Sequence, residues 1–282
     1  MKWLKQHKRW QIILSAGGLS VLLICMIAWI AWGNTALQVT QYTIASPRLP
    51  DGFSGFRIVQ ISDLHNVQFG EDNIRLIEKL RAIKPDIIVI TGDLVDSRRT
   101  NLPVALSFAE QAVQIAPTYY VPGNHEGRLN HISIGNSLHK VGVIPLYDKS
   151  VSLTRQGEEI HLLGLLDDNC RPEGSTEEAL SALMADKEGY TLLLSHRPTF
   201  FDAYVTSGAD LVLTGHVHGG QFRLPFVGGL YTPGQGLFPK YDAGLYTEGR
   251  THMVISRGLG NSAFPFRINN RPEIVVVTLE KG

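Results

Sequence analysis

Five short apolar runs in this chain are each followed directly by residues that can bind a metal ion. The runs are 58–62, 87–91, 118–122, 192–195 and 211–214. Runs of this length and composition indicate strands that are buried on both faces, and helix-like segments separate the first three of them. The alternation predicts an α/β sheet, in which functional side chains gather at the carboxyl ends of the strands.

The residues behind these runs form a mixed set of carboxylate, amide and imidazole groups. They are Asp63, His65, Asp93, Asn124, His125, His196, His216 and His218. One His or Asp at a strand end is usually structural or solvated. Possible metal ligands at five strand ends, however, favour one shared site. Because the set contains no thiolate, it suits Mn²⁺, Fe²⁺, Zn²⁺ or Mg²⁺ better than soft metals.

These residues stand in an ordered series of motifs that resembles a known family. The series is Asp63-x-His65, Gly92-Asp93, Gly123-Asn124-His125-Glu126, His196 and Gly215-His216-x-His218. It resembles the calcineurin-like metallophosphoesterase superfamily. Within it, Gly219-Gly220-Gln221, Arg223-Leu224-Pro225 and the segment 256–260 are similar to a bacterial, membrane-associated branch. The resemblance implies an α/β fold of four layers, a metallophosphoesterase-type αββα sandwich with two stacked sheets between outer helices.

The resemblance also implies a centre with two divalent metal ions per chain, with Mn²⁺, Fe²⁺ or Zn²⁺ expected. Asp93 is expected to bridge both ions. The first ion is expected to be held by Asp93 together with Asp63, His65 and His218. The second is expected to be held by Asp93 together with Asn124, His196 and His216. His216 and His218 would then serve different ions.

A phosphoester hydrolase is the activity that this resemblance implies, with attack by a hydroxide that bridges the two metals. His125 is expected to assist the departing group with a proton or hydrogen bond, and the alternative is that it only supports a ligand. Glu126 either orients His125 or begins a helix. The nearby acids are predicted to be solvated loop carboxylates: Asp96, Asp167 and Asp168.

The N-terminal segment predicts a membrane anchor. Residues 12–32 carry no charge, and a helix of this length covers about 30 Å, the thickness of a bilayer core. Trp10, Trp29 and Trp32 bracket the run as interfacial aromatics do. We expect an uncleaved transmembrane signal anchor at 12–32, and a cleaved signal peptide is the alternative.

The charges around this run predict its orientation. Four basic residues lie within residues 1–11, and none follows the run until Arg48. The positive-inside rule then makes residues 1–11 a short cytoplasmic segment of a single-pass protein of the cell membrane. Residues 33–55 are expected to form a linker with an edge strand, and residues 56–282 an extracytoplasmic catalytic domain.

The remaining chain predicts secondary structure around these motifs. Apolar spacing predicts helices at 72–82, 102–115, 132–140 and 176–184, the last with Thr176 as its N-cap. A hairpin is expected across 151–163, and closing strands at 253–256 and 274–278. The segment 222–245, rich in Gly, Pro and aromatic residues, is predicted to be a long loop that either binds substrate or packs as an Ω-loop.

Composition and missing motifs exclude other classes of protein. Lys plus Arg equal Asp plus Glu, at 26 each, which argues against a dedicated nucleic-acid binder. The chain has neither a P-loop lysine motif nor a Gly-x-Ser-x-Gly elbow, which argues against an NTPase or a serine hydrolase. Of its two cysteines, Cys25 lies in the apolar run, so no disulfide within the domain is expected.

The hypothesis is therefore a membrane-anchored phosphodiesterase or phosphatase that acts on lipid-linked or membrane-proximal phosphoesters. Two alternatives stay open at this point. One is a non-catalytic metal-binding scaffold of the same fold, because a fold does not dictate a function. The other is a phosphodiesterase for nucleotides or nucleic acids. Metal identity, the preference for monoesters or diesters and the oligomeric state are also open.

Overall fold

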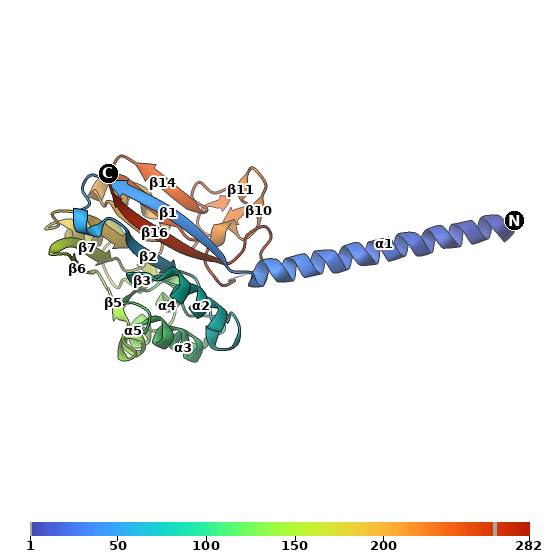
Figure 1. The fold of residues 1–282 in the computed structure, drawn as a ribbon, viewed down its shortest axis with the longest axis horizontal. Helices are drawn as coiled ribbons and strands as arrows, with labels where there is room; N and C mark the ends of the chain where they lie inside the picture. Colours follow the sequence, from blue (N-terminus) through green and yellow to red (C-terminus); the bar gives the residue numbers. More distant parts are fainter. Residues whose placement is uncertain (1, 262–263) are drawn as a thin grey trace.

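The computed structural model describes residues 2–261 and 264–282 of the chain (Figure 1). Within helix α1 (Lys2–Thr35), the side chains of residues 2 and 4–16 lie outside this description. Most side chains of the predicted basic segment 1–11, and those of the first residues of the predicted span, are therefore outside the described part. The described part of α1 contains an apolar span, Gly17–Thr35, that is long enough to cross a membrane.

Two six-stranded sheets form the body of the molecule. The first has the strand order β1-β16-β2-β3-β4-β5. Its strands are β1 (Gln38–Ser46), β2 (Phe56–Ile61), β3 (Ile87–Thr91), β4 (Thr118–Val121), β5 (Ile144–Pro145) and β16 (Glu273–Lys281). Strand β1 pairs in parallel with β16 along its whole length, so the edge strand predicted before residue 55 is present.

The second sheet has the strand order β14-β15-β9-β8-β7-β6. Its strands are β6 (Lys149–Arg155), β7 (Glu158–Gly164), β8 (Thr191–Leu194), β9 (Leu211–Thr214), β14 (Gly244–Glu248) and β15 (Thr251–Ile255). Strands β6 and β7 form the predicted antiparallel hairpin. In both sheets the metal-ligand motifs follow strands that run parallel to one another, β2, β3 and β4 in the first and β8 and β9 in the second.

Helices cover the outer face of each sheet. Those on the first sheet are α2 (Ile74–Ile83), α3 (Leu102–Ala112) and α5 (His131–Lys140), and those on the second are α6 (Thr176–Met184) and α7 (Phe201–Ser207). A short α4 (Asn124–Gly127) lies between β4 and α5. The 3₁₀ turns are η1 (Asp51–Phe53), η2 (Glu71–Asn73), η3 (Asp168–Cys170), η4 (Pro198–Phe200) and η5 (His218–Gly220).

Three apolar cores separate the four layers and explain why the strands are apolar throughout. In β2, Val59 packs toward the helices while Ile58 packs between the two sheets. In β9, Val212 packs toward α6 and α7 while Leu211 packs between the sheets. Successive residues of a strand point to opposite faces, so a strand buried on both faces needs a continuous apolar run. The predicted four-layer αββα sandwich is confirmed.

The start of one helix and the N-cap of another differ from the predictions for local reasons, and α3 ends at Ala112 rather than at 115. Helix α2 begins at Ile74 because Asp72 and Asn73 have left-handed φ values of 49° and 61°. Helix α6 is capped by Ser175, not by Thr176. The Ser175 hydroxyl accepts a hydrogen bond from Glu178 N at 3.1 Å, and the Glu178 carboxylate accepts one from Ser175 N at 3.0 Å, which forms a capping box.

The segment predicted as a long loop contains two small hairpins. They are formed by β10 (Arg223–Leu224) with β11 (Gly228–Gly229), and by β12 (Tyr231–Thr232) with β13 (Gly236–Leu237). Gly228 and Gly236 have left-handed φ values of 98° and 79°, which permit tight turns. The prediction of a long loop missed these hairpins because their strands are too short to carry an apolar period.

Candidate metal centre

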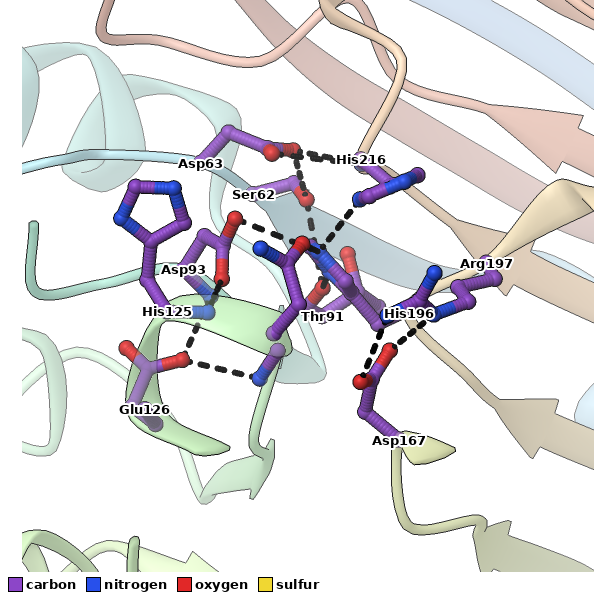
Figure 2. Close-up of polar contacts among 12 residues, drawn as sticks. Ser62, Asp63, Thr91, Asp93, His125, Glu126, Asp167, His196, Arg197 and His216 are labelled. Atoms are coloured by element: carbon purple, nitrogen blue, oxygen red, sulfur yellow. Dashed lines mark hydrogen bonds and ion pairs between the residues drawn. The ribbon is translucent and has the colours of Figure 1, made fainter. Parts of the chain in front are cut away.

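All eight predicted site residues lie together where the carboxyl ends of the two sheets meet. Asp63 and His65 follow β2, Asp93 follows β3, and Asn124 and His125 begin α4 directly after β4. From the second sheet, His196 follows β8, and His216 and His218 follow β9. Figure 2 shows the side chains of Asp63, Asp93, His196 and His216 gathered at this edge. Each of them is buried, and His216 is the most exposed at 9%.

One group of possible ligands consists of Asp63, His65 and His218. The Nε2 atoms of His65 and His218 lie 3.2 Å apart, and Asp63 Oδ1 lies 3.4 Å from His218 Nε2 and 3.9 Å from His65 Nε2. Asp63 is held by the Ser62 hydroxyl, which donates to its Oδ2 at 2.5 Å, and by His216 N at 3.1 Å. Three donor atoms therefore converge on one point.

A second group consists of Asp93, His196 and His216, with Asn124 beside it. His196 Nε2 lies 3.3 Å from Asp93 Oδ2, 3.2 Å from His216 Nδ1 and 3.2 Å from Asn124 Oδ1. The other ring nitrogen of His196 donates to the carbonyl oxygen of Thr91 at 2.8 Å. That bond fixes the ring and directs Nε2 into the centre.

Asp93 stands between the two groups. Its Oδ2 lies 3.6 Å from His65 Nε2 of the first group and 3.3 Å from His196 Nε2 of the second. Its Oδ1 accepts a hydrogen bond from His125 N at 2.8 Å. A carboxylate in this position can be shared by two cations.

The protonation states of the histidines suit a metal site. Burial lowers the pKa of His65 to about 4 and that of His218 to about 3, so both rings are neutral near pH 7. When both Nε2 atoms are unprotonated, as metal binding requires, they direct lone pairs at each other from 3.2 Å apart, and a cation between them would be bound by both. Among the described residues, the buried His65 Nδ1 also has no hydrogen-bond partner.

His196 differs from these two because of its carboxylate neighbour. Burial alone lowers the pKa of His196, but the Asp93 carboxylate outweighs burial and raises the pKa to about 10. The Asp93 carboxylate therefore stabilises positive charge beside Nε2 of His196. A divalent cation bound at this position would supply that charge in place of a proton. The donor set as a whole fits two divalent cations.

The backbone at the centre is strained in a consistent way. Left-handed φ values occur at five of the eight residues, with Asp63 at 53°, His65 at 47°, Asp93 at 52°, His216 at 70° and His218 at 48°. Such conformations cost of order 1–3 kcal/mol each and cluster at functional sites. The turns re-aim His216 and His218, which are two residues apart, toward different ligand groups.

Glu126 supports Asp93 rather than His125. Its buried carboxylate accepts hydrogen bonds from Asp93 N at 2.9 Å, Gly123 N at 2.8 Å and Val95 N at 2.9 Å (Figure 2). Burial and the nearby Asp93 carboxylate raise the pKa of Glu126 to about 7. Of the two interpretations left open, the helix-start carboxylate is the observed one, and it also fixes the loop that presents Asp93.

His125 lies against the first ligand group with a defined tautomer. Its ring contacts that of His65 edge to face, at 4.5 Å between centroids. Its Nδ1 accepts a hydrogen bond from Ser97 N at 3.0 Å, so in the neutral ring the proton is on Nε2. Asp96 Oδ1 lies 3.3 Å from the same Nδ1.

Two of the three acids predicted to be solvated are buried instead. Asp96 faces His125 and accepts a hydrogen bond from Arg98 N at 2.8 Å. Asp167 forms an ion pair with Arg197 at 2.6 Å beside the second ligand group (Figure 2). The prediction was wrong because tertiary partners, which sequence spacing does not reveal, hold both carboxylates. Asp168 is exposed, as predicted.

Arg267 is a neighbour of the centre that the sequence did not indicate. Its side chain is buried, and its Nη2 lies 3.4 Å from His218 Nδ1. The guanidinium also donates to the carbonyl oxygen of Arg257 at 2.8 Å and to that of Gly260. It thereby directs Nε2 of His218 toward Asp63. An arginine in an irregular segment, far along the chain from every ligand motif, gives no local signal of such a role.

Residues 56–220 match the calcineurin-like phosphoesterases. The chain belongs to this family. Family membership and the clustered His and Asp groups support a dinuclear site for divalent metals and a metal-dependent phosphoester hydrolase.

Individual calcineurin-like phosphoesterases resemble the chain over most of its length. The metallophosphoesterase YkuE of Bacillus subtilis is 33% identical, over 86% of this chain and 86% of that protein. The phosphodiesterase YaeI of Escherichia coli is 30% identical, over 81% of this chain and 84% of that protein. A transmembrane protein with a metallophosphoesterase domain from Danio rerio is 29% identical, over 94% of this chain and 62% of that protein. Together with the apolar span of α1, the last similarity suggests a membrane protein.

Proposed function

We propose that this chain is a membrane-anchored phosphoesterase that uses two metal ions to hydrolyse lipid-linked or membrane-proximal phosphate esters. The observation that carries the proposal is the position of Asp93 between two groups of ligands, with His125 beside them. The similarity to a protein named as a phosphodiesterase supports a diester as the first substrate to test.

In this proposal, residues whose donor atoms lie close together bind the same ion. Asp63, His65 and His218 bind one ion, and Asn124, His196 and His216 bind the other, with Asp93 shared. Mn²⁺, Fe²⁺ and Zn²⁺ are the ions that best match carboxylate, amide and imidazole donors. When bound, two such ions supply charge neutralisation at the phosphoryl oxygens and a water nucleophile at neutral pH.

The other residues of the chain hold this arrangement and move a proton. Glu126 fixes Asp93 through a hydrogen bond, and Arg267 lies against the His218 ring with its Nη2 3.4 Å from Nδ1. His125 carries its proton on Nε2 because Ser97 N donates to Nδ1, and this proton is the one donated to the departing alkoxide. After this donation, Nε2 takes up a proton from water, which returns His125 to its neutral, Nε2-protonated form.

The membrane anchor is the apolar span of α1. Trp29 and Trp32 lie in its last part, where aromatic side chains commonly mark the bilayer surface. The helix end is fastened to the domain, because Asn34 Oδ1 accepts a hydrogen bond from Arg267 N at 2.9 Å. The active centre is thereby kept close to the membrane, which favours substrates that reside there.

The test is hydrolysis by the full chain, purified in detergent and freed of metal. Bis-p-nitrophenyl phosphate and p-nitrophenyl phosphate are offered with Mn²⁺, Fe²⁺, Zn²⁺ or Mg²⁺ added singly. We expect metal-dependent release of nitrophenol that is lost in Asp63→Asn and retained in Asp168→Asn. The second variant makes the same change of charge at an exposed carboxylate. A rate that is independent of metal, or unchanged in Asp63→Asn, would contradict the proposal.

A further inference from the structure

The two small hairpins expose an unusual amount of apolar surface. Phe226 at the tip of the first hairpin is fully exposed, and Leu237 and Phe238 in the second are 65% and 61% exposed. We call the exposed apolar side chains of this segment the hairpin surface: Leu224, Phe226, Val227, Tyr231, Leu237 and Phe238. Phe264 and Phe266, whose rings contact Phe222 at the base of the hairpins, are also exposed, whereas Ile74, Ile132 and Ile144 come from separate elements.

This surface is presented by an ordered scaffold. Leu230 N donates to Phe222 O at 2.8 Å, and Phe238 N donates to Leu230 O at 2.9 Å, so the two hairpins lie side by side. The Asp242 carboxylate accepts hydrogen bonds from Gly229 N at 2.6 Å and from the Arg223 guanidinium at 2.9 Å. The apolar tips are therefore held outward while the polar groups of the hairpins are satisfied within.

The hairpins connect directly to the end of the proposed membrane anchor. Arg223 N donates to Ile268 O at 3.0 Å, and the ring of Phe222 packs on that of Phe266 at 5.5 Å. The neighbouring Arg267 N donates to Asn34 at the end of α1. Figure 1 shows β10 and β11 on the side of the domain from which α1 leaves.

Groups typical of the lipid headgroup level surround this junction. A cavity of about 210 Å³ there is lined by Trp29, Trp32, Arg257, Arg267 and Arg271 among others. The Arg271 guanidinium lies over the Trp32 ring at 4.8 Å and donates to Ala36 O at 2.9 Å. Tryptophan and arginine at the end of an apolar span mark the bilayer surface, so that surface passes close to the base of the hairpins.

We propose that the hairpin surface is a second membrane contact, which lies in the interfacial layer of the bilayer beside the anchor. This inference rests on the membrane anchor of the proposed function. It also deepens that function, because η5, which contains His218, immediately precedes β10. The metal centre is then held at the depth of lipid headgroups, and the substrate is a phosphoester whose apolar tail stays in the membrane.

The position of a probe in the full-length chain tests this inference. Phe226→Cys and, separately, Leu237→Cys are made in a Cys25→Ser background and labelled with an environment-sensitive fluorophore. Cys170 is buried and does not compete for the label. Thr154→Cys is the matched control, because Thr154 is exposed on β6, on the side of the domain away from α1 (Figure 1).

The labelled proteins are reconstituted into vesicles of phosphatidylcholine and phosphatidylglycerol, and vesicle flotation checks the anchor independently. We expect a blue shift and quenching by spin-labelled lipids at positions 226 and 237, and neither effect at position 154. Equal behaviour at all three positions would overturn the inference. A blue shift without lipid quenching would also overturn it, and would indicate contact with a second copy of the chain. Because the probe reads depth without turnover, failure here is distinct from failure of the hydrolase assay.

Discussion

At the scale of single residues, Asp93 unites the centre because its two carboxylate oxygens have different partners. Oδ2 faces one histidine from each ligand group, while Oδ1 is held by the backbone N–H of His125. Its own backbone N–H is held by Glu126. The position of Asp93, the proposed shared ligand, is therefore fixed by hydrogen bonds of the protein itself, which is the condition for an efficient metal site.

A proton donor at His125 predicts an effect that depends on the leaving group. We expect His125→Ala to lower kcat by about 10²–10⁴-fold for an alkyl phosphodiester, since an alkoxide needs a proton as it departs. The loss should be much smaller for p-nitrophenyl esters, because nitrophenolate departs without one. Rates for both substrates and the metal content of the variant check this. His161→Ala on β7 is the control. Equal losses accompanied by loss of metal would assign His125 to ligand support instead.

The contact between Arg267 and His218 predicts an effect on metal affinity. We expect Arg267→Met to weaken binding of an ion by about 10–100-fold, as removal of a residue that orients a ligand does. Competition with a chelator measures the dissociation constant. Arg250→Met is the control, because Arg250 is exposed and donates hydrogen bonds to the Gly208 carbonyl oxygen. An unchanged affinity in a folded Arg267→Met protein would refute this role.

At the scale of elements, the strand ends explain why the ligands meet. The strands β8 and β9 are bonded to each other, and Gly215 N continues the pairing by donating to His196 O at 3.0 Å. A Cβ at Gly215 would overlap Ser62 Oγ and Asp63 Oδ2. The second sheet can approach the first closely only because this residue has no side chain.

This close approach predicts the result of Gly215→Ala. We expect the variant to fold but to lose most metal-dependent hydrolysis, because Asp63 must move away from its ligand position. Metal content and the rate with bis-p-nitrophenyl phosphate are the measurements. Gly33→Ala is the control, since a Cβ there meets no atom within 4 Å. Full activity in Gly215→Ala would show that the two sheets can separate without cost to the centre.

The elements also show what sequence can predict. The buried strands and the gathering of the eight polar residues at their ends were predictable, because each strand is an apolar run and each of these residues lies close behind a strand in the chain. The hairpins at 223–237 were not, because backbone hydrogen bonds and glycine turns define them. The burial of Asp96 and Asp167 was not either, because it depends on His125 and Arg197, which lie far away in sequence.

At the scale of the whole molecule, the strands β10 and β11 lie on the side of the domain from which α1 leaves (Figure 1). A balanced charge of 26 basic and 26 acidic residues leaves no broad electrostatic attraction to membranes or nucleic acids. In the proposed arrangement, apolar contact with the bilayer orients the domain, and this orientation rather than long-range charge would present the metal centre to its substrate.

The basic residues before the span predict the topology of the chain. We expect protease added outside intact cells to degrade the catalytic domain and to spare a tag placed before Met1, because positive flanks stay in the cytoplasm. Immunodetection of the tag and of the domain measures this, with detergent-permeabilised cells as the control. If the domain resists protease until the cells are permeabilised, the predicted orientation is wrong and the domain lies in the cytoplasm.

Metal stoichiometry tests the central claim most directly. The metal-free full chain is titrated with Mn²⁺ or Zn²⁺ while bound metal and hydrolysis of bis-p-nitrophenyl phosphate are followed together. We predict that activity requires two ions per chain, that Asp93→Asn fails to bind both and is inactive, and that Asp168→Asn matches the unaltered chain. Full activity with one ion per chain, or an Asp93→Asn protein that keeps two ions and its rate, would contradict a shared dinuclear centre.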